Sequence, residues 1–130
     1  MYQAVTRDIR VTVSPLYVEA ESAPDERRFF WSYTIEIRNM GADTVQLRTR
    51  HWHITDALGR VQEVRGKGVV GKQPMLKPGE AFEYTSGVPL ATASGIMRGD
   101  YEMLGQAGER FLVKVPPFSL DSPHERRVAH

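Results

Sequence analysis

Apolar and polar residues alternate along much of the chain with a period of two, which is the pattern of β-strands that bury one face. The clearest run places Trp31, Tyr33, Ile35 and Ile37 on one side and polar residues on the other. Further strands are predicted at residues 9–13, 44–55, 61–64, 81–86 and 111–115. Because no stretch shows an apolar stripe at helical period, we expect helices to be minor or absent.

Prolines and glycines interrupt this alternation. Pro15 predicts a bulge or an edge position, because proline cannot donate a hydrogen bond to a neighbouring strand. Residues 92–103 predict either a strand pair or one bent strand. Pro116 and Pro117 are expected to stop the sheet, and the tail from Ser119 is polar and expected to be loosely held.

About seven or eight short strands, separated by turns roughly every ten residues, predict an all-β fold, an antiparallel β-sandwich of the immunoglobulin or fibronectin type III kind. The chain has no cysteine, so the immunoglobulin disulfide is missing and the fibronectin-like variant is favoured. A length of 130 residues fits a single domain. We expect residues 1–130 to form that domain, with an ordered core from about residue 5 to about residue 118 and a polar C-terminal tail.

The lack of cysteine also excludes a thiolate metal site and a cysteine nucleophile, and it agrees with a reducing compartment. The N-terminal residues contain no apolar run of signal-peptide length, and no later stretch has the length of a membrane span. We therefore expect a cytoplasmic protein without membrane association.

The net charge of +1 conceals a local excess of basic residues. Residues 46–77 contain seven basic side chains and two acidic ones. Such a face can attract an anionic partner or ligand, although it is also typical of a solvated surface. The isoelectric point of about 8.1 and the lack of aromatic residues between the basic ones argue against nucleic acid as the partner.

Three glycines within this basic region have the spacing G-x-G-x-x-G. The residues concerned are Arg65, Gly66, Lys67, Gly68, Gly71 and Lys72. A dinucleotide-binding motif needs a helix directly after the glycines and an acidic residue about twenty positions later. Here Pro74 and Pro78 follow instead, and residues 84–99 contain no acid. A P-loop is excluded because Gln73, rather than serine or threonine, follows the lysine.

Two interpretations of the glycines remain open. Successive backbone N–H groups could form an anion-binding nest, with Arg65, Lys67 and Lys72 adding charge, which gives a phosphate-binding site over residues 65–72. The simpler interpretation is that the glycines permit positive φ angles or a close backbone approach in a loop that joins the sheets.

Other candidate chemistry is limited. His51 and His53 lie two residues apart on a predicted strand, so they share a face and could bind one metal ion together with a third ligand. Exposed histidines without a metal are the alternative, and Trp52 between them is expected in the core. No G-x-S-x-G motif is present and the carboxylates are scattered, so we expect neither an enzyme nor a cofactor.

Several motifs carry a resemblance to a known family. They include Arg50-His51-Trp52, Thr55-Asp56, Gly66-Lys67-Gly68-Val69-Val70-Gly71-Lys72-Gln73-Pro74, Pro78-Gly79-Glu80 and Gly99-Asp100-Tyr101. With these motifs the chain resembles the bacterial ApaG family over nearly its whole length. The resemblance implies a fibronectin type III-like β-sandwich. ApaG-like domains of F-box and polymerase-delta-interacting proteins resemble protein interaction modules, and bacterial members are linked by name to cobalt and magnesium handling.

The resemblance and the residues together lead to three hypotheses. The first is a non-enzymatic binding module whose unidentified protein partner contacts the loop at 65–77 and the neighbouring strands. The second is a binder of phosphate-containing ligands, pyrophosphate or a dinucleoside polyphosphate, through the glycine loop at 65–72. The third is metal binding through His51 and His53.

Overall fold

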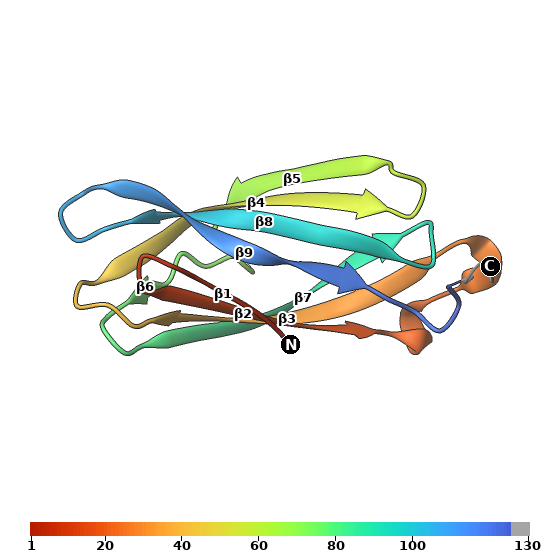
Figure 1. The fold of residues 1–130 in the computed structure, drawn as a ribbon, viewed down its shortest axis with the longest axis horizontal. Coiled ribbons are helices and arrows are strands. Elements are labelled where there is room, and N and C mark those ends of the chain that lie inside the picture. The colour runs from red at the N-terminus through yellow and green to blue at the C-terminus, as the bar shows by residue number, and fades with distance from the viewer. Residues whose placement is uncertain (126–130) are drawn as a thin grey trace.

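The computed structural model describes residues 1–125 and contains two antiparallel β-sheets that lie face to face (Figure 1). The strands are β1 (Tyr2–Thr6), β2 (Ile9–Tyr17), β3 (Phe29–Asn39), β4 (Val45–Asp56), β5 (Val61–Lys67), β6 (Met75–Leu76), β7 (Ala81–Leu90), β8 (Gly95–Leu104) and β9 (Arg110–Leu120). Two short 3-10 helices, η1 (Glu19–Glu21) and η2 (Pro24–Glu26), lie between β2 and β3. Neither helix has the length and apolar character that crossing a membrane requires.

The first sheet has the strand order β1-β2-β3-β7, and the second has the order β5-β4-β8-β9, with β6 beside β4 on the same side as β5. The predicted all-β antiparallel sandwich is confirmed. Residues 1–125 contain nine strands rather than seven or eight. The alternation does not reveal β1, because its Val5 side chain is 51% exposed while Tyr2 and Thr6 are only half-buried. Strand β6 has only two residues.

The prediction for Pro15 is confirmed. It lies in β2 beyond residues 9–13, which are the only part of β2 that pairs with β1, so its missing N–H faces an unpaired edge. Of the two alternatives for residues 92–103, the structure forms one strand, β8, with a register shift between Met97 and Gly99.

The prediction that Pro116 and Pro117 stop the sheet is wrong, because β9 continues to Leu120. The two prolines form a bulge opposite Arg98, where two residues of β9 face one residue of β8. Strand β9 is also an edge strand. Proline is tolerated at both kinds of position since no ladder hydrogen bond is lost there.

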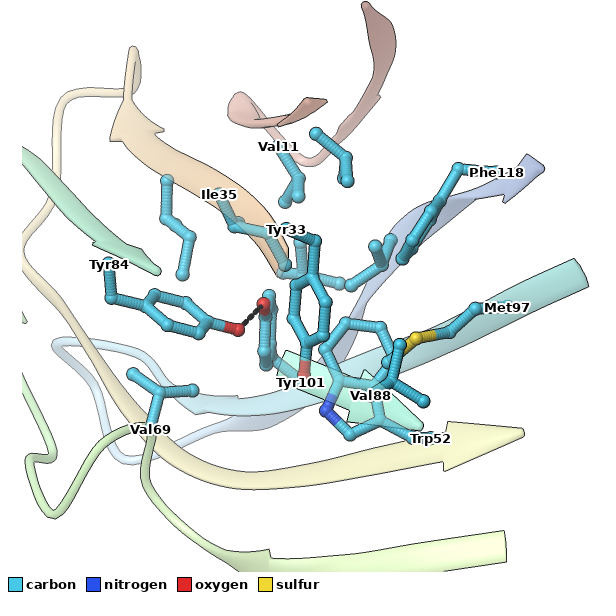
Figure 2. Packing of buried hydrophobic residues seen from close by; sticks show 14 of the residues in the cluster. Val11, Tyr33, Ile35, Trp52, Val69, Tyr84, Val88, Met97, Tyr101 and Phe118 are labelled. Carbon is cyan, nitrogen blue, oxygen red and sulfur yellow. Dashed lines mark hydrogen bonds between the residues drawn. The ribbon is translucent and has the colours of Figure 1, made fainter. Parts of the chain in front are cut away.

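The core lies between the sheets and is built from the inward residues of each alternation. Trp31 illustrates how it is closed, since its ring is buried and its indole N–H donates to the backbone oxygen of Asp121 at 2.8 Å. The start of the predicted polar tail is therefore anchored, whereas residues 126–130 lie outside the described part. In the middle of the core the hydroxyls of Tyr84 from β7 and Tyr101 from β8 form a hydrogen bond of 2.5 Å between the sheets (Figure 2).

The two lateral sides of the sandwich differ. On one side β9 packs beside β1 and β2, and the hydroxyls of Thr6 and Tyr2 each accept a hydrogen bond from a backbone N–H of β9. On the other side the outer strands are β7 of the first sheet and β5 of the second, and β5 stands apart at the top of Figure 1. The glycine segment and the basic residues lie on this second side.

Candidate binding edge and glycine hairpin

A bulge in β4 decides which side chains near the glycines face inward. The pairing of β4 with β8 shifts between Leu47 and Thr49, so one residue is inserted there. Inward positions therefore change from odd numbers, such as Leu47, to even numbers, such as Trp52. Arg50 is in phase with Trp52, and its side chain consequently lies on the inner face of the second sheet at its open side.

The six residues predicted to bind phosphate belong to two elements. Arg65, Gly66 and Lys67 form the end of strand β5, whereas Gly68, Gly71 and Lys72 lie in a hairpin that follows it. The hairpin does not join the two sheets, because it leads from β5 to β6 and both strands pair with β4. The chain crosses to the first sheet only after β6. The prediction that the glycines lie in a loop joining the two sheets is therefore wrong, because the crossing lies several residues further along the chain.

The hairpin is a tight two-residue turn. The N–H of Val69 donates to the oxygen of Lys72 at 2.8 Å, and the N–H of Lys72 donates to the oxygen of Val69 at 2.9 Å. The two central residues, Val70 and Gly71, both have positive φ, of 44° and 78°. Positive φ at both central positions is the requirement of a type I′ turn. The turn buries Val69, which is 1% exposed, in the core and leaves Val70 53% exposed.

The turn geometry leads to a stability prediction. Val70 is β-branched and costs about 1–3 kcal/mol at positive φ, whereas asparagine is favoured at this turn position. Val70→Asn should therefore raise the free energy of unfolding by about 1 kcal/mol, measured by urea denaturation. Val70→Ala is the matched control and should gain less, because alanine also disfavours positive φ. A loss of stability in Val70→Asn would show that packing by the valine outweighs its backbone strain.

The first two glycines of the motif provide space. Arg50 Nη1 donates to the oxygens of Lys67 and Gly68 at 3.1 and 2.9 Å, and the guanidinium lies directly over Gly66. A Cβ at position 66 would be 2.7 Å from Nη1. A Cβ at position 68 would overlap the backbone oxygen of Lys72. The close approach to the glycines that the sequence allowed is thus present. The guanidinium of Arg50 approaches Gly66, and the backbone oxygen of Lys72 approaches Gly68.

Most backbone N–H groups of the hairpin are already bonded. Gly68 donates to the backbone of β4 at 2.9 Å, and Val69 and Lys72 bond each other. Within the described residues, the N–H groups of Val70 and Gly71 are the two in this hairpin without a backbone acceptor. An anion at the hairpin would meet two turn amides and the surrounding lysines. Phosphate binding at residues 65–72 remains a prediction, now resting on fewer amides than a full nest supplies.

The exposed side of this region combines basic and apolar side chains. We call it the basic edge, and it consists of Val61, Arg65, Lys67, Val70, Lys72 and Met75. The N–H of Gly68 donates to the oxygen of Arg48 in β4. In an antiparallel pair the backbone groups of alternate residues point toward the neighbouring strand and away from it. The N–H and C=O groups of Glu63 and Arg65 therefore point away from β4. Among residues 1–125 no strand pairs with this outer side of β5. The backbone of β5 is therefore available to another chain.

His51 and His53 point to the outer face of the second sheet, as predicted, while Trp52 is buried between them. His51 Nε2 lies 3.8 Å from Glu63 Oε1. Among residues 1–125 there is no group of three or more potential His, Cys, Asp or Glu ligands arranged to hold a metal ion. Metal binding through the two histidines stays a prediction without a third ligand.

A buried polar cluster that the sequence did not predict lies behind the glycine hairpin. It contains the hydroxyls of Tyr33, Tyr84 and Tyr101, and Arg50 is close enough to act on all three. Burial raises the pKa of each tyrosine, and the positive charge of Arg50 opposes the increase. The change from odd to even inward positions in β4 is the sequence signal that would have placed Arg50 in this cluster.

These features define a β-sandwich domain with an exposed basic edge strand and a short glycine hairpin. The chain belongs to the ApaG family, because the family model described as ApaG domain matches residues 19–105. The ApaG protein of Bradyrhizobium diazoefficiens is 65% identical over 128 residues, covering 98% of both chains. The ApaG protein of Rhodospirillum centenum is 65% identical over 126 residues, covering 97% of both.

A solved structure agrees with this assignment. The crystal structure of the putative ApaA protein from Bordetella pertussis superposes with a TM-score of 0.87 at 49% sequence identity. The match covers 91% of this chain and 96% of that chain. The family resemblance and the β-sandwich expected from the sequence are both confirmed.

Proposed function

We propose that this member of the ApaG family is a non-enzymatic binding module that holds a protein partner along the basic edge. The observation that carries the proposal is the unpaired outer side of β5, where exposed Arg65 and Lys67 outnumber the one acid, Glu63. An extended segment of a partner can add to such an edge through main-chain hydrogen bonds, with side chains providing specificity. Arg65, Lys67 and Lys72 favour acidic residues in that segment.

The length of free edge limits the contact. Arg50 already binds the oxygen of Lys67, so strand addition is available opposite Val61 to Arg65 and ends at the hairpin. Beyond that point the partner would contact exposed Val70 and Met75. In the proposed interface the partner therefore forms backbone hydrogen bonds along β5 and contacts only side chains beyond it.

The test is charge reversal on the edge. Arg65→Glu combined with Lys67→Glu changes two exposed side chains and should reduce partner capture from a cell extract at least tenfold. Arg27→Glu with Arg28→Glu is the matched control, because these exposed residues lie in the connection between β2 and β3. The control should capture the same partner as the unmodified protein, measured by quantitative mass spectrometry. Equal capture by both double variants would refute the proposed surface.

The phosphate hypothesis keeps one supporting observation, the pair of free turn amides at Val70 and Gly71 beside Lys72. Titration with inorganic pyrophosphate distinguishes it from partner binding. Saturable shifts of those two amide resonances below millimolar pyrophosphate would make the hairpin an anion site. No shift, together with charge-dependent protein capture, would leave the protein partner as the function of the basic edge.

A further inference from the structure

A cavity opens between the two sheets on the side of β5 and β7, separate from the exposed basic edge. Its volume is about 250 Å³, and Trp52, Ile54, Val64 and Met97 form its apolar walls. At about 30 Å³ for each water molecule in the liquid, this volume equals roughly eight waters. The cavity therefore has the size for a compact organic molecule rather than for a nucleotide.

The polar part of the cavity is built around one positive charge. Arg50, Tyr33 and Ser86 line it together with the apolar walls. Figure 2 shows the oxygen of Tyr33 and the ring nitrogen of Trp52 directed to the same side of the cluster. The centroids of the two rings are 5.7 Å apart. A guanidinium, a phenol and an indole N–H are all hydrogen-bond donors.

Arg50 is held in place without a counter-charge. Its Nη1 donates to two backbone oxygens, and Gly66 leaves the space in which the guanidinium lies. The ion pairs found within residues 1–125 do not include Arg50. A guanidinium has five N–H donors, so donors remain after the two backbone bonds. A guanidinium with unused donors and no carboxylate partner can pair with a carboxylate that a ligand supplies.

We propose that this cavity binds a small monocarboxylate with an apolar body. The carboxylate pairs with Arg50, and the body packs against Trp52 and Met97. A single guanidinium matches the charge and the fork geometry of one carboxylate. Because the remaining walls are mostly apolar, a phosphate group would lose hydration there without gaining enough donors. The glycine at position 66 then serves this site, by positioning the arginine rather than by binding an anion itself.

The experiment is an NMR titration of the ¹⁵N-labelled protein with sodium benzoate as the probe. We expect saturable shifts at the Trp52 indole and at the amides of Ser86 and Gly87. Benzyl alcohol has the same apolar body without the charge, and inorganic phosphate has charge without the body. Each should bind at least tenfold more weakly than benzoate. This comparison uses the unmodified protein and does not depend on the folding of any variant.

Two variants test the role of the arginine. Arg50→Gln should weaken benzoate binding at least tenfold, whereas Arg27→Gln, at an exposed position in the connection between β2 and β3, should leave it unchanged. Circular dichroism checks that both remain folded. Equal binding of benzoate and benzyl alcohol, equal binding of phosphate, or shifts that map outside the cavity would each overturn the proposal. If Arg50→Gln does not fold, the benzoate and benzyl alcohol comparison alone decides the outcome.

Discussion

Raising the pH toward 12 should unfold this protein cooperatively, because buried tyrosines resist ionisation inside it. Burial raises the pKa of Tyr33, Tyr84 and Tyr101 above the ordinary value of 10.0. In the unfolded chain these groups ionise near that ordinary value. The folded state therefore retains protons that the unfolded state has lost, and stability falls as the pH rises.

The expected size of this effect follows from proton linkage. Below pH 10 all three tyrosines are neutral in both states and contribute no pH dependence. At pH 11 each tyrosine that stays protonated in the fold destabilises it by about 1.4 kcal/mol, so Tyr84 and Tyr101, with the largest increases in pKa, give about 3 kcal/mol, and about 5 kcal/mol at pH 12. Small domains have a total stability of about 5–15 kcal/mol. A domain at the lower end of this range should therefore unfold near pH 12.

The measurement combines tyrosinate absorbance at 295 nm with near-ultraviolet circular dichroism. The part of the absorbance that belongs to the buried tyrosines should appear together with the loss of the dichroism signal. Replacing both members of the hydroxyl pair, Tyr84→Phe with Tyr101→Phe, should move the alkaline midpoint upward while changing stability little at pH 7. Tyr84→Phe alone should cost about 1–3 kcal/mol at pH 7, since the buried Tyr101 hydroxyl loses its partner. The chain has five tyrosines, so the contradicting result is the absorbance of all five tyrosinates in a still-folded protein, which would show that water reaches the cluster.

The alternation of residues predicted most of the fold because burial of one face is a local property of each strand. In β3 every second residue from Phe29 to Asn39 is buried, so the strand is visible from its sequence alone. In β9 the two prolines suggested an end to the sheet. Proline excludes a ladder hydrogen bond, but it does not exclude a bulge on an edge strand, and the sequence does not say which strand is at an edge.

The candidate site could be predicted only in part. The basic residues of the edge were visible, and the glycines indicated a special backbone. Neither pattern shows that Val69 is buried while Val70 is exposed, because both are valines in one turn. The inward direction of Arg50 depends on the bulge in β4, which reverses the phase of the strand. A single inserted residue therefore moves the side chain of Arg50 from the outer to the inner face of the second sheet.

Gly68→Ala should be the most damaging substitution in the glycine hairpin. Gly68 has a φ of +62°, and a Cβ at this position would overlap the oxygen of Lys72. The substitution combines backbone strain of about 1–3 kcal/mol with overpacking of about 1–3 kcal/mol. Opening the turn also withdraws Val69 from the core. We expect the free energy of unfolding to fall by about 3 kcal/mol or more, measured by urea denaturation.

Gly71→Ala is the matched control, since Gly71 lies in the same turn with a φ of +78° but has open space where a Cβ would be. This variant should lose only the cost of the positive φ, about 1 kcal/mol. The difference between the two variants isolates the steric contribution of the close approach at position 68. Equal losses would show that backbone conformation alone requires these glycines. A larger loss for Gly68→Ala, with perturbed Val69 methyl resonances, would show that the motif exists to seat one valine in the core.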